Sequence, residues 1–138
     1  KFSKNIRTIV IPNKQEVFTV SLFLTCNSTY CVYCLICPCK LWYIGSTIHP
    51  AKKRVQEHIR AIKNVDKQYP VARHFKDVHQ SNSDLLSFFV VDSIPITIRG
   101  GNREKCLRRL ESKYIIDFDT MTPLGHNKDE ELYIHLGD

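Results

Sequence analysis

The sequence lacks the features that direct a chain into or across a membrane. Its first residues have neither a continuous apolar core nor a small-residue cleavage site, so no signal peptide is expected. Residues 17–39 carry no charge and are long enough to span a bilayer. However, Asn27, Ser28 and Pro38 interrupt this run, and β-branched and aromatic residues dominate it. Two strands joined by a turn therefore explain it better, and we expect no membrane partner.

An initial methionine is also missing. The chain begins at Lys1, and its only methionine is Met121, which favours a fragment or one domain of a longer protein. The 138 residues are 43% hydrophobic and 25% charged, and they contain no internal repeat or low-complexity segment. These values are typical of one soluble globular domain.

Acidic residues are scarce relative to basic ones. The chain has 14 Asp and Glu against 20 Lys and Arg, a net charge of +6. Excess positive charge raises the local concentration of polyanions, which makes nucleic acid a candidate partner. Many basic domains bind no nucleic acid, so the choice requires a motif.

The cysteines are not spread along the chain. Five of the six lie between residues 26 and 39, and Cys106 stands alone. A secreted disulfide framework would space its pairs more widely. We therefore expect a reducing compartment, nuclear or cytoplasmic, in which the thiols are free or bind zinc.

Apolar patterning predicts an N-terminal strand followed by strands and helices in the order β-β-α-(α)-β-α, an α+β layer arrangement. The predicted strands are 17–24, 30–36, 41–44 and 85–94. Gly45 is expected to close the third of them. The predicted helices begin at Pro50, near Val71 and after a break at Gly100 and Gly101. The apolar stripe of the last helix is Leu107, Leu110, Tyr114, Ile115 and Phe118.

Two polar features of the predicted helices do not suit simple packing. Glu111 lies four residues after Leu107 and four before Ile115, on the inward stripe, where a carboxylate is costly unless it is paired or binds a metal. The alternative is an edge glutamate that reaches solvent or an arginine. Arg54 and His58 are spaced i,i+4 and share one helix face, which a solvated basic face would also explain.

Tyr33 and Tyr43 fall on adjacent predicted strands, where cross-strand packing alone is a sufficient explanation. The Cys37-Pro-Cys39 segment and the downstream His74 and His79 together offer two thiolates and two imidazoles. These four groups suit a closed, tetrahedral zinc site.

The zinc ligands are not settled by spacing. Cys34 and Cys37 have the commoner two-residue separation and form a rival pair. Buried free cysteines beside a pair of surface histidines are the alternative to any metal site.

Several short motifs, taken together in their order and spacing, resemble a GIY-YIG endonuclease domain of the type carried by Penelope-like retroelements. The matching pieces are Cys31-Val-Tyr33, Tyr43-Ile-Gly45, Arg54-Val-Gln-Glu-His58, Pro70-Val-Ala-Arg-His74, Arg99-Gly-Gly-Asn-Arg103, Arg109-Leu-Glu-Ser112 and Pro123-Leu-Gly-His-Asn127. The first motif lacks its glycine, and His126 stands where an apolar residue is more usual.

The resemblance implies an endonuclease domain over residues 26–132, which leaves an N-terminal strand extension over 1–25 and a tail over 133–138. It implies a small three-stranded antiparallel sheet flanked by helices, DNA as substrate, and a reverse transcriptase domain upstream in the full-length protein. The activity it implies is metal-dependent hydrolysis of a DNA phosphodiester bond, a nick that serves retroelement integration.

Carried over by motif, the catalytic residues are Tyr33, Tyr43, Arg54, His58, Glu111 and Asn127. Glu111 would hold one Mg²⁺ or Mn²⁺ ion, which suits an oxygen ligand. Tyr33 would accept a proton from the attacking water, directly or through His58. Arg54 and Tyr43 would bind the scissile phosphate. Asn127 would contribute a polar contact that orients the site.

The resemblance also implies that Cys37, Cys39, His74 and His79 form a structural zinc site, which favours Cys39 over Cys34. Basic residues around the site either follow the DNA backbone or form a solvated face: Lys52, Lys53, Arg60, Lys63 and Arg73. Two rival functions remain: an inactive, zinc-stabilised DNA-binding module derived from such a nuclease, and a cysteine-rich zinc module for protein contacts.

Overall fold

The computed structural model describes residues 8–12, 17–19, 24–66, 68–96, 102–122 and 124–127. The elements in chain order are β1 (Thr8–Val10), β2 (Val17–Thr19), β3 (Cys31–Ile36), β4 (Tyr43–Thr47), α1 (Ala51–Lys63), α2 (Pro70–His79), the 3₁₀ helix η1 (Ser83–Leu85), β5 (Ser87–Ser93) and α3 (Asn102–Asp117). None of the helices in these ranges has the length and apolar character needed to cross a membrane.

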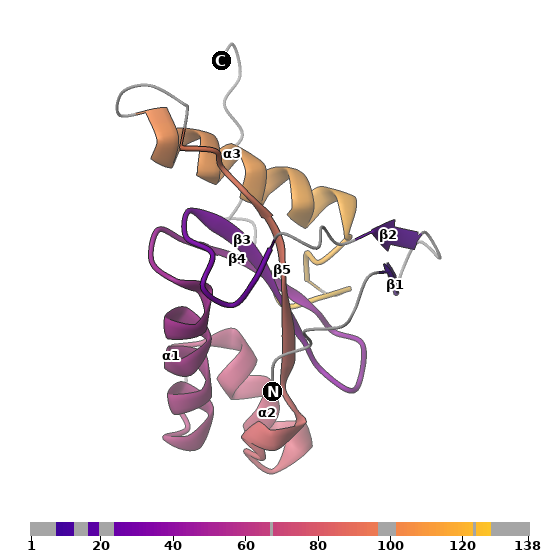
Figure 1. The fold of residues 1–138 in the computed structure, drawn as a ribbon. Coiled ribbons are helices and arrows are strands. Elements are labelled where there is room, and N and C mark those ends of the chain that lie inside the picture. Colours follow the sequence, from indigo (N-terminus) through magenta and orange to yellow (C-terminus); the bar gives the residue numbers. More distant parts are fainter. Residues whose placement is uncertain are drawn as a thin grey trace.

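A three-stranded antiparallel sheet in the order β4-β3-β5 forms the centre of the molecule (Figure 1). β3 is the middle strand, and its Tyr33 pairs with Gly45 on one side and with Val90 on the other. The sheet and its helices follow the order β-β-α-α-β-α, which confirms the predicted α+β class and the three-stranded antiparallel sheet.

Helices cover both faces of this sheet, as Figure 1 shows. On one face, Val32 and Cys34 join a core cluster with residues of α3; on the other, Tyr33 and Leu35 pack with residues of α1 and α2. The predicted alternation of β3 is therefore confirmed, and both sets of side chains are buried because the strand lies between two layers.

The last helix buries the predicted stripe. Leu107, Tyr114, Ile115 and Phe118 are buried against the sheet, and Leu110 is partly buried against the same cluster. This stripe fixes which side of α3 faces β4, and it thereby determines where the polar residues between its members lie.

The strand predicted over residues 41–44 is displaced: β4 starts at Tyr43 and continues through Gly45 to Thr47. Gly45 does not end the strand. A Cβ atom at this position would overlap the hydroxyl and ring of Tyr33, so the glycine is required inside the strand to let that side chain cross the backbone.

The predicted strand over residues 17–24 is described only in part. Within it, β2 spans Val17–Thr19 and pairs with β1 in a separate two-stranded sheet, and residues 20–23 lie outside the described part. Its Phe18 ring lies 5.8 Å from Tyr114 and 5.1 Å from Phe118, centroid to centroid. The predicted domain start at residue 26 stays a prediction, and the predicted tail over 133–138 lies outside the described residues.

Candidate active site and metal centre

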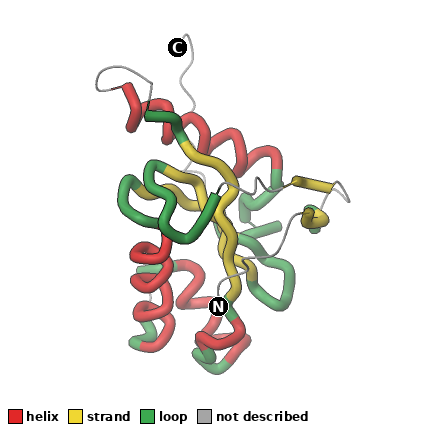
Figure 2. Tube along the Cα trace, viewed as in Figure 1, coloured by secondary structure: helices red, strands yellow, loops and turns green. Residues whose placement is uncertain are grey.

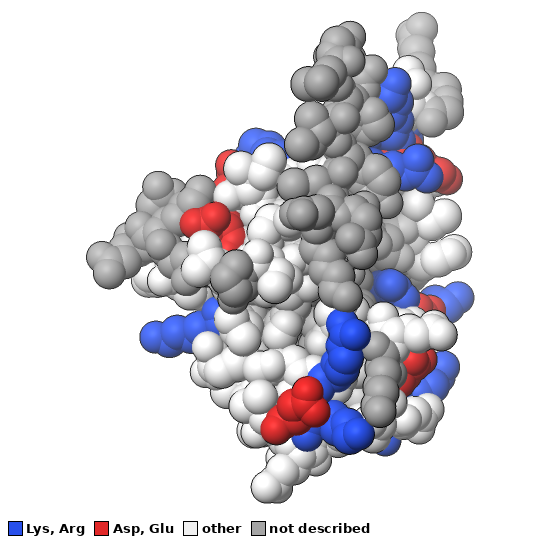
Figure 3. All heavy atoms as spheres, turned by 180° about the vertical axis from the view of Figure 1, so that it is seen from behind, with Lys and Arg blue, Asp and Glu red and all other residues white. Residues whose placement is uncertain are grey.

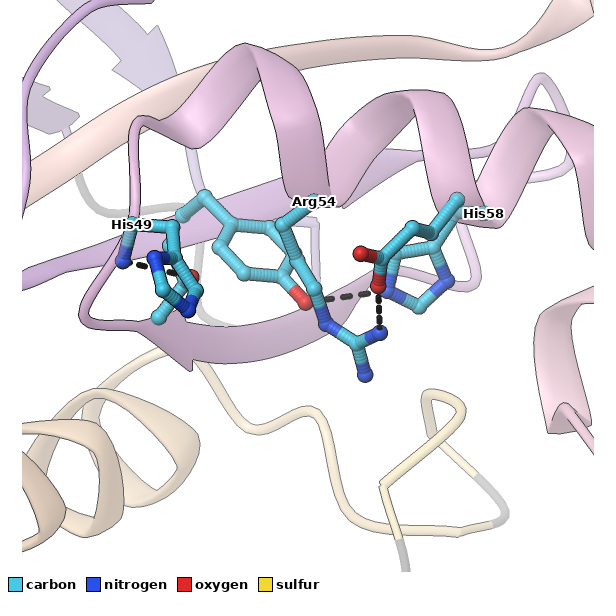
Figure 4. Close-up of polar contacts among 6 residues, drawn as sticks. His49, Arg54 and His58 are labelled. Carbon is cyan, nitrogen blue, oxygen red and sulfur yellow. Dashed lines mark hydrogen bonds and ion pairs between the residues drawn. The ribbon is translucent and has the colours of Figure 1, made fainter.

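A buried hydrogen bond joins the sheet to the first helix. Tyr33 Oη of β3 lies 2.9 Å from Nε2 of His58 on α1, and the two residues are 1% and 3% exposed. Figure 4 shows His58 and Arg54 extending from the same side of α1, one turn apart. The i,i+4 spacing read from the sequence thus brings both side chains to the phenol.

Tyr43 joins this group from the neighbouring strand. Its ring centroid lies 5.6 Å from that of His58, and the ring of Tyr69 lies 5.5 Å from His58 on another side. Tyr69 was not predicted as a site residue. It precedes α2 directly, and only the packing of α2 against α1 brings it here.

Burial determines the protonation of the phenol and the imidazole. It raises the pKa of Tyr33, an effect that the positive charge of Arg54 opposes and the negative charge of Glu111 reinforces. Burial, together with the charge of Arg54, lowers the pKa of His58 to about 3. A neutral imidazole beside a neutral phenol means that Tyr33 donates the hydrogen bond and Nε2 of His58 accepts it. Nδ1 of His58 then carries the proton, and it is buried without a hydrogen-bond partner among the described residues.

Arg54 is half-buried and supplies a positive charge beside Tyr33. Its Nη1 donates to Oε1 of Glu57 at 2.6 Å, and its guanidinium lies 5.9 Å from the ring centroid of Tyr69. The dashed line from Arg54 in Figure 4 marks the first of these contacts. Glu57 balances part of the charge, and its i,i+3 spacing from Arg54 is the sequence signal that would have found it.

Glu111 lies on the side of β4 that faces α3, opposite the side on which Tyr33 and Tyr43 lie. It is 8% exposed on α3, as its place on the apolar stripe predicted, and its Oε1 accepts a hydrogen bond of 2.6 Å from Ser46 Oγ. Ser46 follows Gly45 in β4. Sequence reasoning missed it, although strand alternation places it on the face that α3 covers, opposite Tyr43 and Gly45.

Asn127 is fully buried, and its side chain clamps β4 by bonding the backbone of Ile44. Its Oδ1 accepts from the Ile44 amide at 2.9 Å and from Thr120 Oγ1 at 2.6 Å, while its Nδ2 donates to the Ile44 carbonyl at 2.9 Å. Because Ile44 lies between Tyr43 and Gly45, this side chain acts on the site by holding the strand in place.

The metal ligands proposed from sequence lie together. One ligand atom from each of Cys37, Cys39, His74 and His79 falls within a group in which all atoms are within 4.8 Å of one another. Figure 2 shows the β3–β4 loop at the same end of the molecule as α2, from which both histidines come. Cys34 instead belongs to the core cluster on the α3 face, so the rival pair is not assembled.

The contacts within the cluster pair each thiol with one imidazole. Cys37 Sγ lies 2.9 Å from Nε2 of His79 and 3.0 Å from Cys39 Sγ, and Cys39 Sγ lies 3.0 Å from Nε2 of His74. Burial, with a further contribution from Cys39, raises the pKa of Cys37 to about 12. Two sulfur and two nitrogen donors are a set that zinc accepts, so this cluster could hold a metal such as zinc.

A further histidine adjoins the cluster. His126 is 8% exposed, its ring centroid lies 4.6 Å from that of His74, and its Nε2 is buried without a hydrogen-bond partner. Its backbone amide donates to the Trp42 carbonyl at 2.9 Å. Burial, with smaller contributions from His74 and His79, lowers the pKa of His126 to about 4.

The predicted basic residues on α1 and α2 are all exposed: Lys52, Lys53, Arg60, Lys63 and Arg73. Figure 3 shows Lys and Arg side chains with Asp and Glu among them over the end of the molecule where α1 and α2 lie. This mixture suits both a solvated surface and a weakly basic face.

The structure thus gathers Tyr33, Tyr43, Arg54 and His58 on one side of β4 and brings Glu111 to its other side through Ser46. No protein-family model, curated protein or solved structure matches the chain.

Proposed function

We propose that the protein is a divalent-metal-dependent DNA endonuclease of the GIY-YIG type, which nicks DNA for retroelement integration. The observation that carries the proposal is the buried hydrogen bond of 2.9 Å between Tyr33 and His58, with the charge of Arg54 beside it. A phenol, an imidazole and a guanidinium that meet in this way supply the proton acceptor and the cation that phosphodiester hydrolysis requires.

The proton from the attacking water would pass to the Tyr33–His58 pair. His58 is neutral because burial holds its pKa at about 3, so its Nε2 accepts the phenol hydrogen while the phenol oxygen accepts from water. Arg54 favours the phenolate form of Tyr33 and would bind the phosphate as negative charge develops on it. Tyr43 would provide a second hydroxyl for the phosphate.

Glu111 is the residue that would hold the divalent cation. A bound Mg²⁺ or Mn²⁺ would stabilise the leaving oxygen of the scissile bond. The donor fits in kind, because Mg²⁺ prefers carboxylate oxygen and keeps several waters. The Ser46 hydroxyl, 2.6 Å from Oε1, fixes the carboxylate relative to β4, and Asn127 fixes β4 itself.

The test is nicking of a supercoiled plasmid with and without Mg²⁺. We expect Mg²⁺-dependent nicking by the wild-type protein and no detectable nicking by Glu111→Ala. Tyr33→Phe is expected to lower the rate about 100-fold or more, since it removes the proton-handling oxygen. Lys113→Ala, two residues along α3 at an exposed position, is the matched control and should nick at the wild-type rate. Nicking by Glu111→Ala at the wild-type rate would contradict the proposal.

One observation favours a second candidate, an inactive zinc-stabilised DNA-binding module. Tyr33 is 1% exposed and burial raises its pKa, which opposes ionisation of the proposed proton acceptor. This module would shift a labelled DNA duplex in a gel without nicking the plasmid at any Mg²⁺ or Mn²⁺ concentration. Binding and nicking measured on one preparation therefore separate the two functions.

A further inference from the structure

The contact between His126 and His74 is not explained by the proposed hydrolysis or by the four metal donors. His126 comes from the loop after α3, whereas His74 lies on α2, and their ring centroids are 4.6 Å apart. A buried imidazole nitrogen without a hydrogen-bond partner, such as Nε2 of His126, is costly and needs a reason.

The geometry of the cluster supplies that reason. Nε2 of His74 faces Cys39 Sγ at 3.0 Å, so this is the nitrogen that would bind a metal. An imidazole that binds a metal through Nε2 carries its proton on Nδ1 and donates it to a neighbouring acceptor, which fixes the ring. Within the described ranges, the hydrogen bond found at the His74 ring is the one at Nε2, which leaves Nδ1 to bond His126.

We propose that His126 is a positioning residue for the metal centre: its Nε2 accepts a hydrogen bond from Nδ1 of His74 when a metal is bound. Nε2 of His126, which lacks a hydrogen-bond donor, and Nδ1 of His74, which needs an acceptor, belong to two rings in contact. The backbone of His126 is held in place by its amide bond to Trp42 and by the neighbouring Asn127, whose side chain clamps Ile44. These contacts therefore fix the backbone from which the acceptor nitrogen extends.

The inference does not depend on nuclease activity, because metal affinity measures it directly. The probe is Zn²⁺ alone, titrated against a chromophoric chelator. His126→Phe keeps a buried ring but removes the nitrogen, and we expect it to weaken Zn²⁺ binding about 10- to 100-fold. His126→Gln retains an acceptor and should recover part of the loss. His49→Phe, at an exposed position before α1, is the control and should bind as the wild type does.

Melting of the metal-free variants in excess chelator separates positioning from packing. We expect His126→Phe to melt near the wild-type temperature without metal and to lose stability mainly when Zn²⁺ is present. Equal Zn²⁺ affinity in the wild type and His126→Phe would overturn the proposal, as would a wild-type chain that binds no Zn²⁺. A loss of equal size with and without metal would show a packing role only and would also overturn it.

Discussion

At the scale of single residues, the chemistry of the site depends on burying an imidazole that stays neutral. His58 is 3% exposed, and its pKa is lowered from 6.5 to about 3, first by burial and then by Arg54. Burial also raises the pKa of Tyr33. At neutral pH the phenol of Tyr33 therefore keeps its proton and donates it in the hydrogen bond to Nε2 of His58. An environment that holds the pair neutral makes the protein sensitive to acid.

This sensitivity has a definite sign. Between pH 6.5 and about 3 the unfolded chain binds a proton at His58 that the folded chain does not, so stability falls as the pH drops through this window. From about pH 7.5 to about pH 5 the His58 contribution amounts to a loss of about 2 kcal/mol. Urea unfolding in excess chelator should show a smaller acid-induced loss for His58→Gln than for the wild type.

The control for this measurement is His49→Gln, because His49 is exposed. Its unfolding free energy should follow the wild-type pH profile. His126 also has a lowered pKa and adds to the acid loss in every one of these proteins, so only the difference between profiles is informative. Parallel profiles for His58→Gln and the wild type would contradict the assignment of a buried, neutral His58.

At the scale of elements, the strand β4 is the part on which the site residues depend. α3 reaches it through Glu111 and Ser46, and the last described residues reach it through Asn127. These contacts join segments separated by 65 and 83 residues. The position of β4 therefore depends on residues that are distant from it in the sequence.

Removing the Asn127 side chain should destabilise the protein strongly. Asn127→Ala leaves the buried amide and carbonyl of Ile44 without their partners, at a cost of about 2 kcal/mol or more. Asn127→Asp keeps the acceptor but loses the donor and should fall between Ala and the wild type. Asn64→Ala, at the exposed end of α1, is the control for urea unfolding. A loss below about 0.5 kcal/mol for Asn127→Ala would contradict the clamp.

Periodicity predicted the three strands of the central sheet and the three α-helices, but not the contacts between them. The alternation of β3 and the stripe of α3 identified their buried faces because local spacing determines which side chains share a face. The end of β4 was misjudged, since the need for Gly45 arises from Tyr33 on another strand. A local sequence pattern does not predict which side chains pack against each other across neighbouring strands.

The same limit applies to the site. Tyr33 and His58 are 25 residues apart, and no spacing rule pairs them. The motif resemblance named both residues, but Ser46 and Tyr69 were missed because their roles come from the docking of α3 and α2. Whether the assembled residues cleave DNA stays a prediction that the nicking assay tests.

At the scale of the whole molecule, the cysteine and histidine cluster links the β3–β4 loop to α2. Cys37 and Cys39 come from the loop, and His74 and His79 lie 35 and 42 residues further along the chain. A metal that binds only the folded chain stabilises it by mass action, by about 2.7 kcal/mol at 100 times the dissociation constant. The β3–β4 loop and α2 would then be held together until the metal is released.

Metal removal should therefore lower the melting temperature of the wild type by several degrees. We expect elemental analysis to find about one zinc per chain, and Cys39→Ser to lose both the zinc and the stabilisation by it. Cys106→Ser, on α3 and outside the cluster, is the control and should keep both. A wild-type protein without zinc, whose melting temperature is unchanged by a chelator, would contradict the metal centre.

The clamp on β4 has one more consequence, which concerns association between chains. β4 is an edge strand of the β4-β3-β5 sheet, so among the described residues no further strand pairs with its outer side. The side-chain amide of Asn127 offers Ile44 the donor and acceptor that an added strand would offer, and the backbone N–H of His126 offers a donor to the Trp42 carbonyl. These two residues occupy the start of a sheet edge at which an extended segment from another molecule could otherwise pair.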